Sequence, residues 1–110
     1  MKTLLILRHA KSSWNDPALD DHERPLNKRG RRDAPRMGEL VREYGLIPDV
    51  VISSDAVRAR LTAEAVVEAA RYAGEILVDQ RLYMASPAHI LSLLRAVREK
   101  AETVMIVGHN

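Results

Sequence analysis

Histidine and arginine side chains stand at the ends of apolar runs in this 110-residue chain. Arg8 and His9 directly follow the run "TLLIL", and His109 directly follows "TVMIVG". Arg58 stands in the segment "SSDAVRARLTAEA", shortly after another apolar run. A neutral imidazole can attack phosphorus and accept a phosphoryl group, and guanidinium groups bind phosphate oxygens in pairs. These residue types therefore indicate phosphoryl chemistry, if the fold brings them together.

Four apolar runs are predicted as strands, at residues 3–7, 49–53, 76–78 and 103–108. Their continuous apolar character is typical of strands that a parallel sheet buries on both faces. The run at 76–78 is the weakest of the four.

Helical spacing of apolar residues predicts three helices between these strands, at about 28–44, 55–73 and 86–101. Asp55 is the expected N-cap of the second helix, and Ser86 with Pro87 is expected to open the third. The predicted buried stripes are Ala34, Met37, Leu40, Val41 and Tyr44 in the first helix, Val57, Leu61, Ala65 and Glu68 in the second, and Ile90, Leu91, Leu94, Val97 and Ala101 in the third.

This alternation favours a single α/β domain over residues 1–110, a three-layer α/β/α sandwich with a mostly parallel sheet. Ligands of such sheets bind beyond the carboxyl ends of the strands. The fold would therefore bring two imidazoles and two guanidiniums to one rim. Alone, each has an ordinary explanation, such as a hydrogen-bonded histidine or a solvated arginine. Their joint placement favours a phosphoryl-binding site.

Composition excludes several classes of protein. Apolar residues make up 46% and charged residues 29%, the ordinary globular range, and without cysteine there is no disulfide, thiolate zinc site or cysteine nucleophile. The first apolar run is too short for a membrane span or signal-peptide core, so we expect a cytoplasmic protein. Basic residues cluster in "ERPLNKRGRRDAPR", either a solvated helix face or a docking surface for an acidic protein. Without interleaved aromatic residues we do not expect nucleic-acid binding.

Three segments resemble those of a known family. "LRHA", "SSDAVRARLTAEA" and "IVGHN" resemble the signature segments of the histidine phosphatase (phosphoglycerate mutase-like) superfamily. "RHAKSSW" and the following "RPL" and "RG" resemble its small SixA-like phosphohistidine phosphatase branch. The resemblance implies that His9 becomes phosphorylated while Arg8, Arg58 and His109 hold the phosphoryl oxygens, with no metal or other cofactor.

The proton donor is not indicated by a motif, because the insertion that carries it in larger members of the superfamily is missing here. The resemblance to the SixA-like branch, whose corresponding loop brings an acidic residue near the phosphate, implies Asp21 in "DDHERPL" for this role, with Asp20 and Glu23 as rivals. Ordinary solvated carboxylates are the alternative for all three. A phosphohistidine needs such an acid less than an alkyl phosphate does, because its leaving group can depart already protonated. The short chain therefore favours phosphohistidine as the substrate.

Four further residues near these motifs carry weaker expectations. Arg24 is expected to anchor the loop at 16–26 or to contact phosphate, and Trp14 to wall the site entrance or cover the sheet edge. His22 and His89 match no motif position, so both are expected at the surface or in helix caps.

The predicted function is that of a phosphohistidine phosphatase acting on a phosphorylated partner protein. The alternatives are a small-molecule phosphomonoesterase, a phosphoglycerate mutase and a phosphate-binding module without turnover. Relatives continue past the residue matching Asn110 with a further helix and usually a strand, so this chain is expected to be shortened at its C-terminus. Apolar surface left around the fourth strand would then favour a dimer, and the activity of the shortened chain is left open.

Overall fold

The computed structural model describes residues 3–83, 86–97 and 101–109. Its strands are β1 (Thr3–Arg8), β2 (Val50–Ser53), β3 (Ile76–Val78) and β4 (Thr103–Gly108). They pair in parallel in the order β1-β4-β2-β3. The four predicted strands are confirmed to within one residue at each end.

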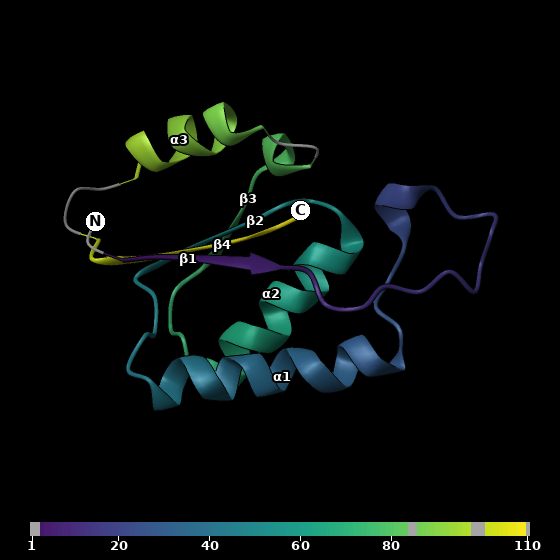
Figure 1. Ribbon diagram of the computed structural model, residues 1–110, viewed down its shortest axis with the longest axis horizontal. Helices are drawn as coiled ribbons and strands as arrows, with labels where there is room; N and C mark the ends of the chain where they lie inside the picture. Colours follow the sequence, from purple (N-terminus) through teal and green to yellow (C-terminus); the bar gives the residue numbers. More distant parts are fainter. Residues whose placement is uncertain (1–2, 84–85, 98–100, 110) are drawn as a thin grey trace.

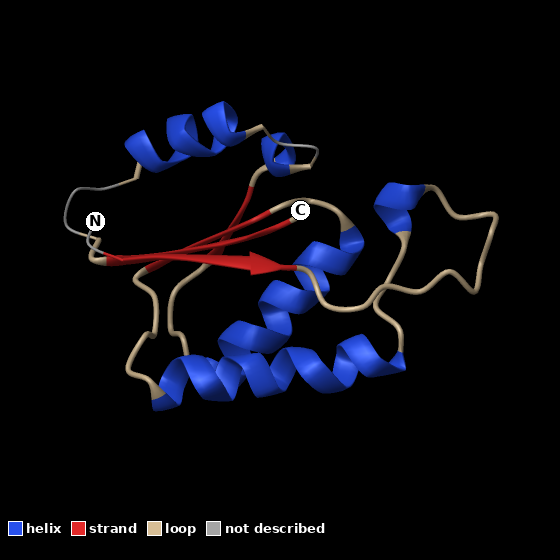
Figure 2. Ribbon diagram, viewed as in Figure 1, coloured by secondary structure: helices blue, strands red, loops and turns tan. Residues whose placement is uncertain are grey.

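Helices cover both faces of this sheet. The α-helices are α1 (Lys28–Glu43), α2 (Val57–Ala70) and α3 (Pro87–Arg95), and two short 3-10 helices are η1 (Asp21–Glu23) and η2 (Gln80–Leu82). Figure 1 shows α1 and α2 on one side of the sheet and α3 on the other. The predicted three-layer α/β/α architecture is therefore confirmed, and Figure 2 shows the helical layers above and below the strands. No described helix is long and apolar enough to cross a membrane.

Strand β4 lies inside the sheet, and its alternate residues serve the two apolar layers. Met105 and Val107 belong to the core beneath α1 and α2, whereas Val104 and Ile106 belong to the core beneath α3. All four are at most 2% exposed. The expectation of exposed apolar surface around the fourth strand is therefore wrong for β4 itself. Its place between β1 and β2 buries it, and the large exposed apolar side chains of the sheet lie on the edge strands β1 and β3.

Helix α1 buries Ala34 and Val41 as predicted but not the other residues of its predicted stripe, and helix α2 buries none of its predicted stripe. In α1, Met37 and Leu40 are about two-fifths exposed, and Gly38 is buried in their place. A Cβ on Gly38 would lie 2.3 Å from the Val66 carbonyl oxygen, so α1 approaches α2 through a glycine rather than through large apolar residues. In α2 the buried residues are Arg58, Ala59, Thr62, Ala63, Val66 and Ala70.

The predicted ends of α2 are also wrong. Asp55 does not cap the helix; Ala56 is the N-cap, and within the described residues no side chain caps this end. The Asp55 carboxylate instead forms an ion pair with His22 at 2.9 Å. The helix ends at Ala70 instead of about Ala73, because Arg71 adopts a left-handed conformation with φ 60° and closes the last turn.

Helix α3 begins as predicted and ends earlier. Ser86 accepts a hydrogen bond from the His89 backbone N–H at 3.3 Å, and Pro87 occupies the first turn. The helix stops at Arg95, and the predicted continuation over 98–100 lies outside the described residues. Leu93 is the buried residue of this helix, and the predicted Leu91 is 53% exposed.

The loop after β1 is fastened to the start of α1. The Asn27 N–H donates to the Lys11 carbonyl at 2.9 Å, and Ser12 forms an isolated antiparallel bridge with Leu26. Gly30, in the first turn of α1, approaches the Lys11 carbonyl so closely that a Cβ would lie 2.2 Å from its oxygen. The backbone two residues after His9 therefore depends on a glycine in α1.

We expect Gly30→Ala to destabilise the fold by about 1–3 kcal/mol, because the added methyl group forces the loop away from the helix. Replacing glycine with alanine inside a helix ordinarily stabilises a protein by about 0.8–1.0 kcal/mol. The contact with Lys11 is therefore expected to turn a stabilising substitution into a destabilising one. Urea unfolding of the two proteins measures the difference. Glu39→Ala, at an exposed position of the same helix, is the matched control and should be nearly neutral. Equal or higher stability of Gly30→Ala would contradict the close approach.

Candidate functional site

His9 lies directly beyond β1, where its backbone N–H donates to the Gly108 carbonyl at 3.0 Å. Its ring Nδ1 donates to the carbonyl oxygen of Ala10 at 2.7 Å. A neutral imidazole that donates through Nδ1 has its lone pair on Nε2. The Nε of Arg58 donates to this Nε2 at 3.4 Å. The lone pair of His9 therefore faces the guanidinium.

His109 lies directly beyond β4, beside His9, because Arg8 and Gly108 are partners in the β1–β4 register. The two ring centroids are 5.3 Å apart. Nε2 of His109 lies 3.0 Å from the Ser54 hydroxyl, and its Nδ1 lies 3.5 Å from Nη2 of Arg58. The two imidazoles thus share one guanidinium at the carboxyl end of the sheet.

Arg58 is 6% exposed, and the turn of α2 that carries it is bonded to the loop after His9. The Thr62 hydroxyl donates to the Arg58 carbonyl at 2.8 Å and accepts from the Ala10 N–H at 2.9 Å. One side chain therefore joins the helix of Arg58 to the residue that follows His9.

Both imidazoles are neutral near physiological pH. Burial lowers the pKa of His9 below its ordinary 6.5, and the charges of Arg58, Arg8 and Arg24 lower it further, against the opposing effect of the Ala10 hydrogen bond. Burial, followed by the charges of Arg58 and His9, lowers the pKa of His109 to about 4. A neutral His9 retains the lone pair that a nucleophile requires.

The Asp21 carboxylate lies between two arginines and a tyrosine. Its Oδ1 accepts from Nη1 of Arg24 at 2.7 Å, and its Oδ2 accepts from Nη2 of Arg58 at 2.9 Å. The Tyr83 hydroxyl donates to the same Oδ2 at 2.7 Å. The hydrogen bond from Tyr83, followed by those from Arg24 and Arg58, holds the pKa of Asp21 well below its ordinary value, so this carboxylate is ionised at neutral pH.

Arg24 and Trp14 form one side of the site. Arg24 is 6% exposed, and its guanidinium donates to the Ser13 carbonyl at 3.0 Å and to the Ser12 hydroxyl. Its central carbon lies 3.1 Å from the centroid of the Trp14 ring. Trp14 itself is 75% exposed, so Arg24 covers part of the indole and leaves much of it accessible.

Sequence reasoning missed Tyr83 and the pairing of His22. The Tyr83 ring packs edge-on against His109, with ring centroids 5.4 Å apart, and against His22 at 4.9 Å. The hydrogen bonds that the His22 ring donates to the carboxylates of Asp55 and Glu23 raise the pKa of His22, which was expected to be a surface or capping residue. Tyr83 follows η2, just beyond the carboxyl end of β3, so the rule that ligands bind beyond strand ends could have identified it.

We expect Tyr83→Phe to lower turnover about three- to tenfold while leaving the ring packing intact, because one hydrogen bond to the Asp21 carboxylate is lost. The pKa of Asp21 should rise, since the Tyr83 hydroxyl is the main cause of its low value. Carboxyl NMR titration and steady-state kinetics measure the two effects. Tyr44→Phe, at the C-cap of α1, where the tyrosine is 74% exposed, is the control. An unchanged Asp21 titration in Tyr83→Phe would contradict the positioning role.

A cavity of about 500 Å³ opens beside His9. Its lining residues come from the loop after β1, the segment before and inside α1, and α2: Arg8, His9, Ala10, Lys11, Ser12, Trp14, Arg24, Asn27, Arg29 and Arg58. Five of them are cationic and none is acidic, so the cavity favours an anion. Within the described part of the chain, no three histidine, cysteine or acidic side chains gather where they could hold a metal ion.

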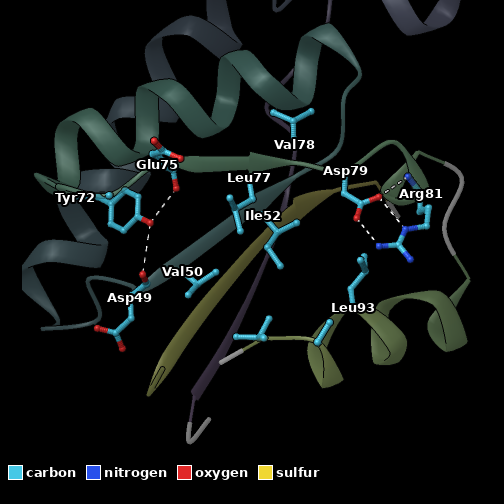
Figure 3. A pocket seen from close by; sticks show the side chains of 13 residues that line it. Asp49, Val50, Ile52, Tyr72, Glu75, Leu77, Val78, Asp79, Arg81 and Leu93 are labelled. Atoms are coloured by element: carbon cyan, nitrogen blue, oxygen red, sulfur yellow. Dashed lines mark hydrogen bonds and ion pairs between the residues drawn. The ribbon is translucent and has the colours of Figure 1, made fainter. Parts of the chain in front are cut away.

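A second cavity, of about 560 Å³, lies between the β2–β3 side of the sheet and α3. Figure 3 shows its apolar lining, with Val50, Ile52, Leu77 and Leu93 among the labelled residues. Nη2 of Arg81 donates to the Asp79 carboxylate at 2.8 Å, and the Tyr72 hydroxyl donates to the Glu75 carbonyl at 3.0 Å. None of its lining residues is a histidine, serine or cysteine, so the candidate site for phosphoryl chemistry is the cavity beside His9.

Comparison with known proteins gives consistent results. The sequence model of the histidine phosphatase superfamily (branch 1) matches residues 4–83. An uncharacterised protein of Mycobacterium tuberculosis strain H37Rv is 39% identical over 105 residues, which cover 94% of this chain and 62% of that protein. An uncharacterised chloroplastic protein of Arabidopsis thaliana is 46% identical over 61 residues, 56% of this chain and 28% of that protein. The chain thus spans less than two thirds of the length of these relatives.

Solved structures share the whole described architecture. An Agrobacterium tumefaciens protein provisionally identified as the phosphohistidine phosphatase SixA superposes with a TM-score of 0.90 at 34% identity, covering 100% of this chain and 71% of its own. The protein histidine phosphatase SixA in complex with tungstate superposes with a TM-score of 0.84 at 22% identity, covering 96% of this chain and 68% of its own. The second likeness is one of fold.

Proposed function

Because this chain belongs to the histidine phosphatase superfamily, in its SixA-like branch, we propose that it is a phosphohistidine phosphatase. Its substrate is a phosphohistidine on a partner protein, and His9 carries the phosphoryl group during turnover. The observation that supports this proposal most directly is the neutral His9 ring, whose Nε2 lone pair faces the buried Arg58 with His109 alongside. This arrangement combines a nucleophile with donors for the phosphoryl oxygens.

In the first step, Nε2 of His9 attacks phosphorus and the phosphorus–nitrogen bond of the substrate breaks. The electron pair of that bond stays on the leaving imidazole, which departs neutral when its other ring nitrogen already carries a proton. Arg8, Arg58 and His109 bind the non-bridging oxygens and stabilise their charge in the transition state. In the second step, water attacks the phosphorus of phosphorylated His9, and inorganic phosphate leaves as the His9 lone pair is restored.

Asp21 has an ionised carboxylate in this site, which supports a different role from the proton donor expected from the sequence. Its bonds to Arg24 and Arg58 fix the directions of both guanidiniums before substrate binds. We therefore assign Asp21 the positioning of these arginines. A phosphohistidine substrate is compatible with this role because its leaving group needs no separate acid.

The partner is expected to be acidic. Lys28, Arg29, Arg31 and Arg32 are exposed at the start of α1, next to the site cavity. Their field should accelerate the association of an acidic protein and weaken as salt is added. A dimer stays a separate proposal, for which the exposed Ile6 on β1 and Leu77 and Val78 on β3 offer edge surfaces, and light scattering tests it.

Rapid quenching tests the proposed function. The chain is mixed with a ³²P-labelled phosphohistidine protein, and the reaction is quenched within milliseconds to seconds. Mass spectrometry then identifies the phosphorylated residue. The expected result is an acid-labile, alkali-stable phosphoryl group on His9 together with the release of inorganic phosphate. Phosphate binding without label at His9 would support the module without turnover. Label from a small phosphomonoester, and none from the protein, would support the phosphomonoesterase.

A further inference from the structure

The cavity beside His9 has a wall that the proposed phosphoryl chemistry does not use. Arg8, His9 and Arg58 line the cavity, and Nε of Arg58 donates to the attacking Nε2 of His9 at 3.4 Å. Lys11 and Arg29 also line the cavity, from the loop after β1 and from the first turn of α1. A single phosphoryl group fills only a small part of about 500 Å³, so space is left beside these two cations.

The charges of Lys11 and Arg29 are poorly neutralised. Among the described residues, no carboxylate lies within ion-pair distance of the Lys11 ammonium. Nε of Arg29 lies 3.7 Å from Asp33, whose carboxylate also faces Arg32 at 3.4 Å. The Arg29 side chain is 67% exposed, so this pairing is weak. Arg24, which also lines the cavity, is better neutralised, because its guanidinium donates to the Asp21 carboxylate and to backbone and hydroxyl oxygens.

The backbone beneath these cations is held at a fixed distance from His9. Lys11 lies two residues after His9, and its carbonyl accepts the Asn27 N–H at 2.9 Å. Ser13 donates to the Pro25 carbonyl at 2.8 Å, and Gly30 packs directly on Lys11. An anion bound by Lys11 and Arg29 would therefore have a defined position relative to a phosphoryl group on His9.

We propose that Lys11 and Arg29 form a second anion subsite, which binds a carboxylate of the protein substrate next to its phosphohistidine. This inference rests on the proposed function for the identity of the phosphorylated group. A protein surface fits the subsite because both cations are exposed at the rim, beside the exposed ring of Trp14. The subsite would select phosphohistidine proteins with an aspartate or glutamate near the reacting histidine.

Peptide binding tests the subsite independently of turnover. Two peptides carry the same stable triazole analogue of phosphohistidine, one with flanking glutamates and one with glutamines at the same positions. Calorimetry measures the affinities of both peptides for the unsubstituted chain and for its Lys11→Gln, Arg29→Gln and Arg36→Gln variants. Arg36 is exposed on α1 and does not line the cavity, so its variant loses the same charge without touching the subsite.

The unsubstituted chain should prefer the glutamate peptide, and Lys11→Gln and Arg29→Gln should each reduce this preference about three- to fivefold. Arg36→Gln should keep most of it. Equal affinity for the two peptides, or an equal loss in Arg36→Gln, would overturn the subsite. If the preference is present but the corresponding true phosphohistidine peptides are not hydrolysed, the subsite stands and the proposed phosphatase activity fails.

Discussion

Replacing His9 with asparagine should reduce phosphohistidine hydrolysis by about 10⁴-fold or more, because the covalent route loses its nucleophile. The proposed nucleophile is Nε2 of His9, which faces Arg58. The side-chain amide of asparagine has no comparable nucleophilic nitrogen. Rapid-quench kinetics should detect no phosphoryl group on the variant. Phosphate or vanadate should still bind, since Arg8, Arg58 and His109 are unchanged.

The matched control is His89→Asn, at an exposed position in the first turn of α3 and remote from the cavity beside His9. Its activity should equal that of the unsubstituted chain. The pH profile gives a second readout, because the pKa of His9 lies below 6.5. The kcat/KM of the active protein should fall only as acid protonates His9, with a midpoint below 6.5. More than a tenth of normal activity in His9→Asn would rule out the assigned nucleophile.

Replacing Arg58 with glutamine should reduce kcat/KM by about 10²–10³-fold, the loss typical of one donor to the charge of a transition state. Arg58 reaches three groups of the site, with Nε at His9, Nη2 at His109 and both Nη atoms at Asp21. The variant should therefore also bind vanadate more weakly. A loss confined to kcat, with unchanged vanadate affinity, would contradict the role in phosphoryl binding.

Histidine titration separates this electrostatic role from a structural one. The charge of Arg58 lowers the pKa of both His9 and His109, so Arg58→Gln should raise both values. They should stay below 6.5, because burial is the larger cause and persists in the variant. Arg60→Gln, exposed two residues later in α2, is the control and should leave both titrations nearly unchanged. Circular dichroism establishes that each variant is folded before these comparisons are made.

Much of the fold was predictable from local patterns. Continuous apolar runs identified the four strands to within one residue, and Ser86 with Pro87 identified the start of α3. The helical faces were less predictable, because hydrophobicity alone does not show which side meets a neighbour. Gly38 is buried in α1 where Met37 and Leu40 were expected, since close helix contact favours the smallest residue over the most apolar ones.

The candidate site was likewise predictable only in part. His9, Arg8, Arg58 and His109 were predicted from their positions at or after strand ends, and the parallel strands bring His9, Arg58 and His109 together at one edge. Tyr83, the contact of Ser54 with His109 and the bonding of Asp21 were not identified, because each depends on contacts between segments far apart in the sequence. Tyr83 and Asp21 are 62 residues apart, and their hydrogen bond exists only when the end of β3 meets the loop before α1.

The sequence by itself determined the element types, the parallel α/β class and the residues able to carry phosphoryl chemistry, because these follow from local periodicity and side-chain chemistry. Only the tertiary structure decided the strand order β1-β4-β2-β3, which places His109 beside His9. It also decided the ionisation of the site, since burial and the charge of Arg58 lower the pKa of His109, and hydrogen bonds from Tyr83, Arg24 and Arg58 lower the pKa of Asp21. Local sequence contains neither burial nor the distance to a distant charge, and both arise when the layers pack.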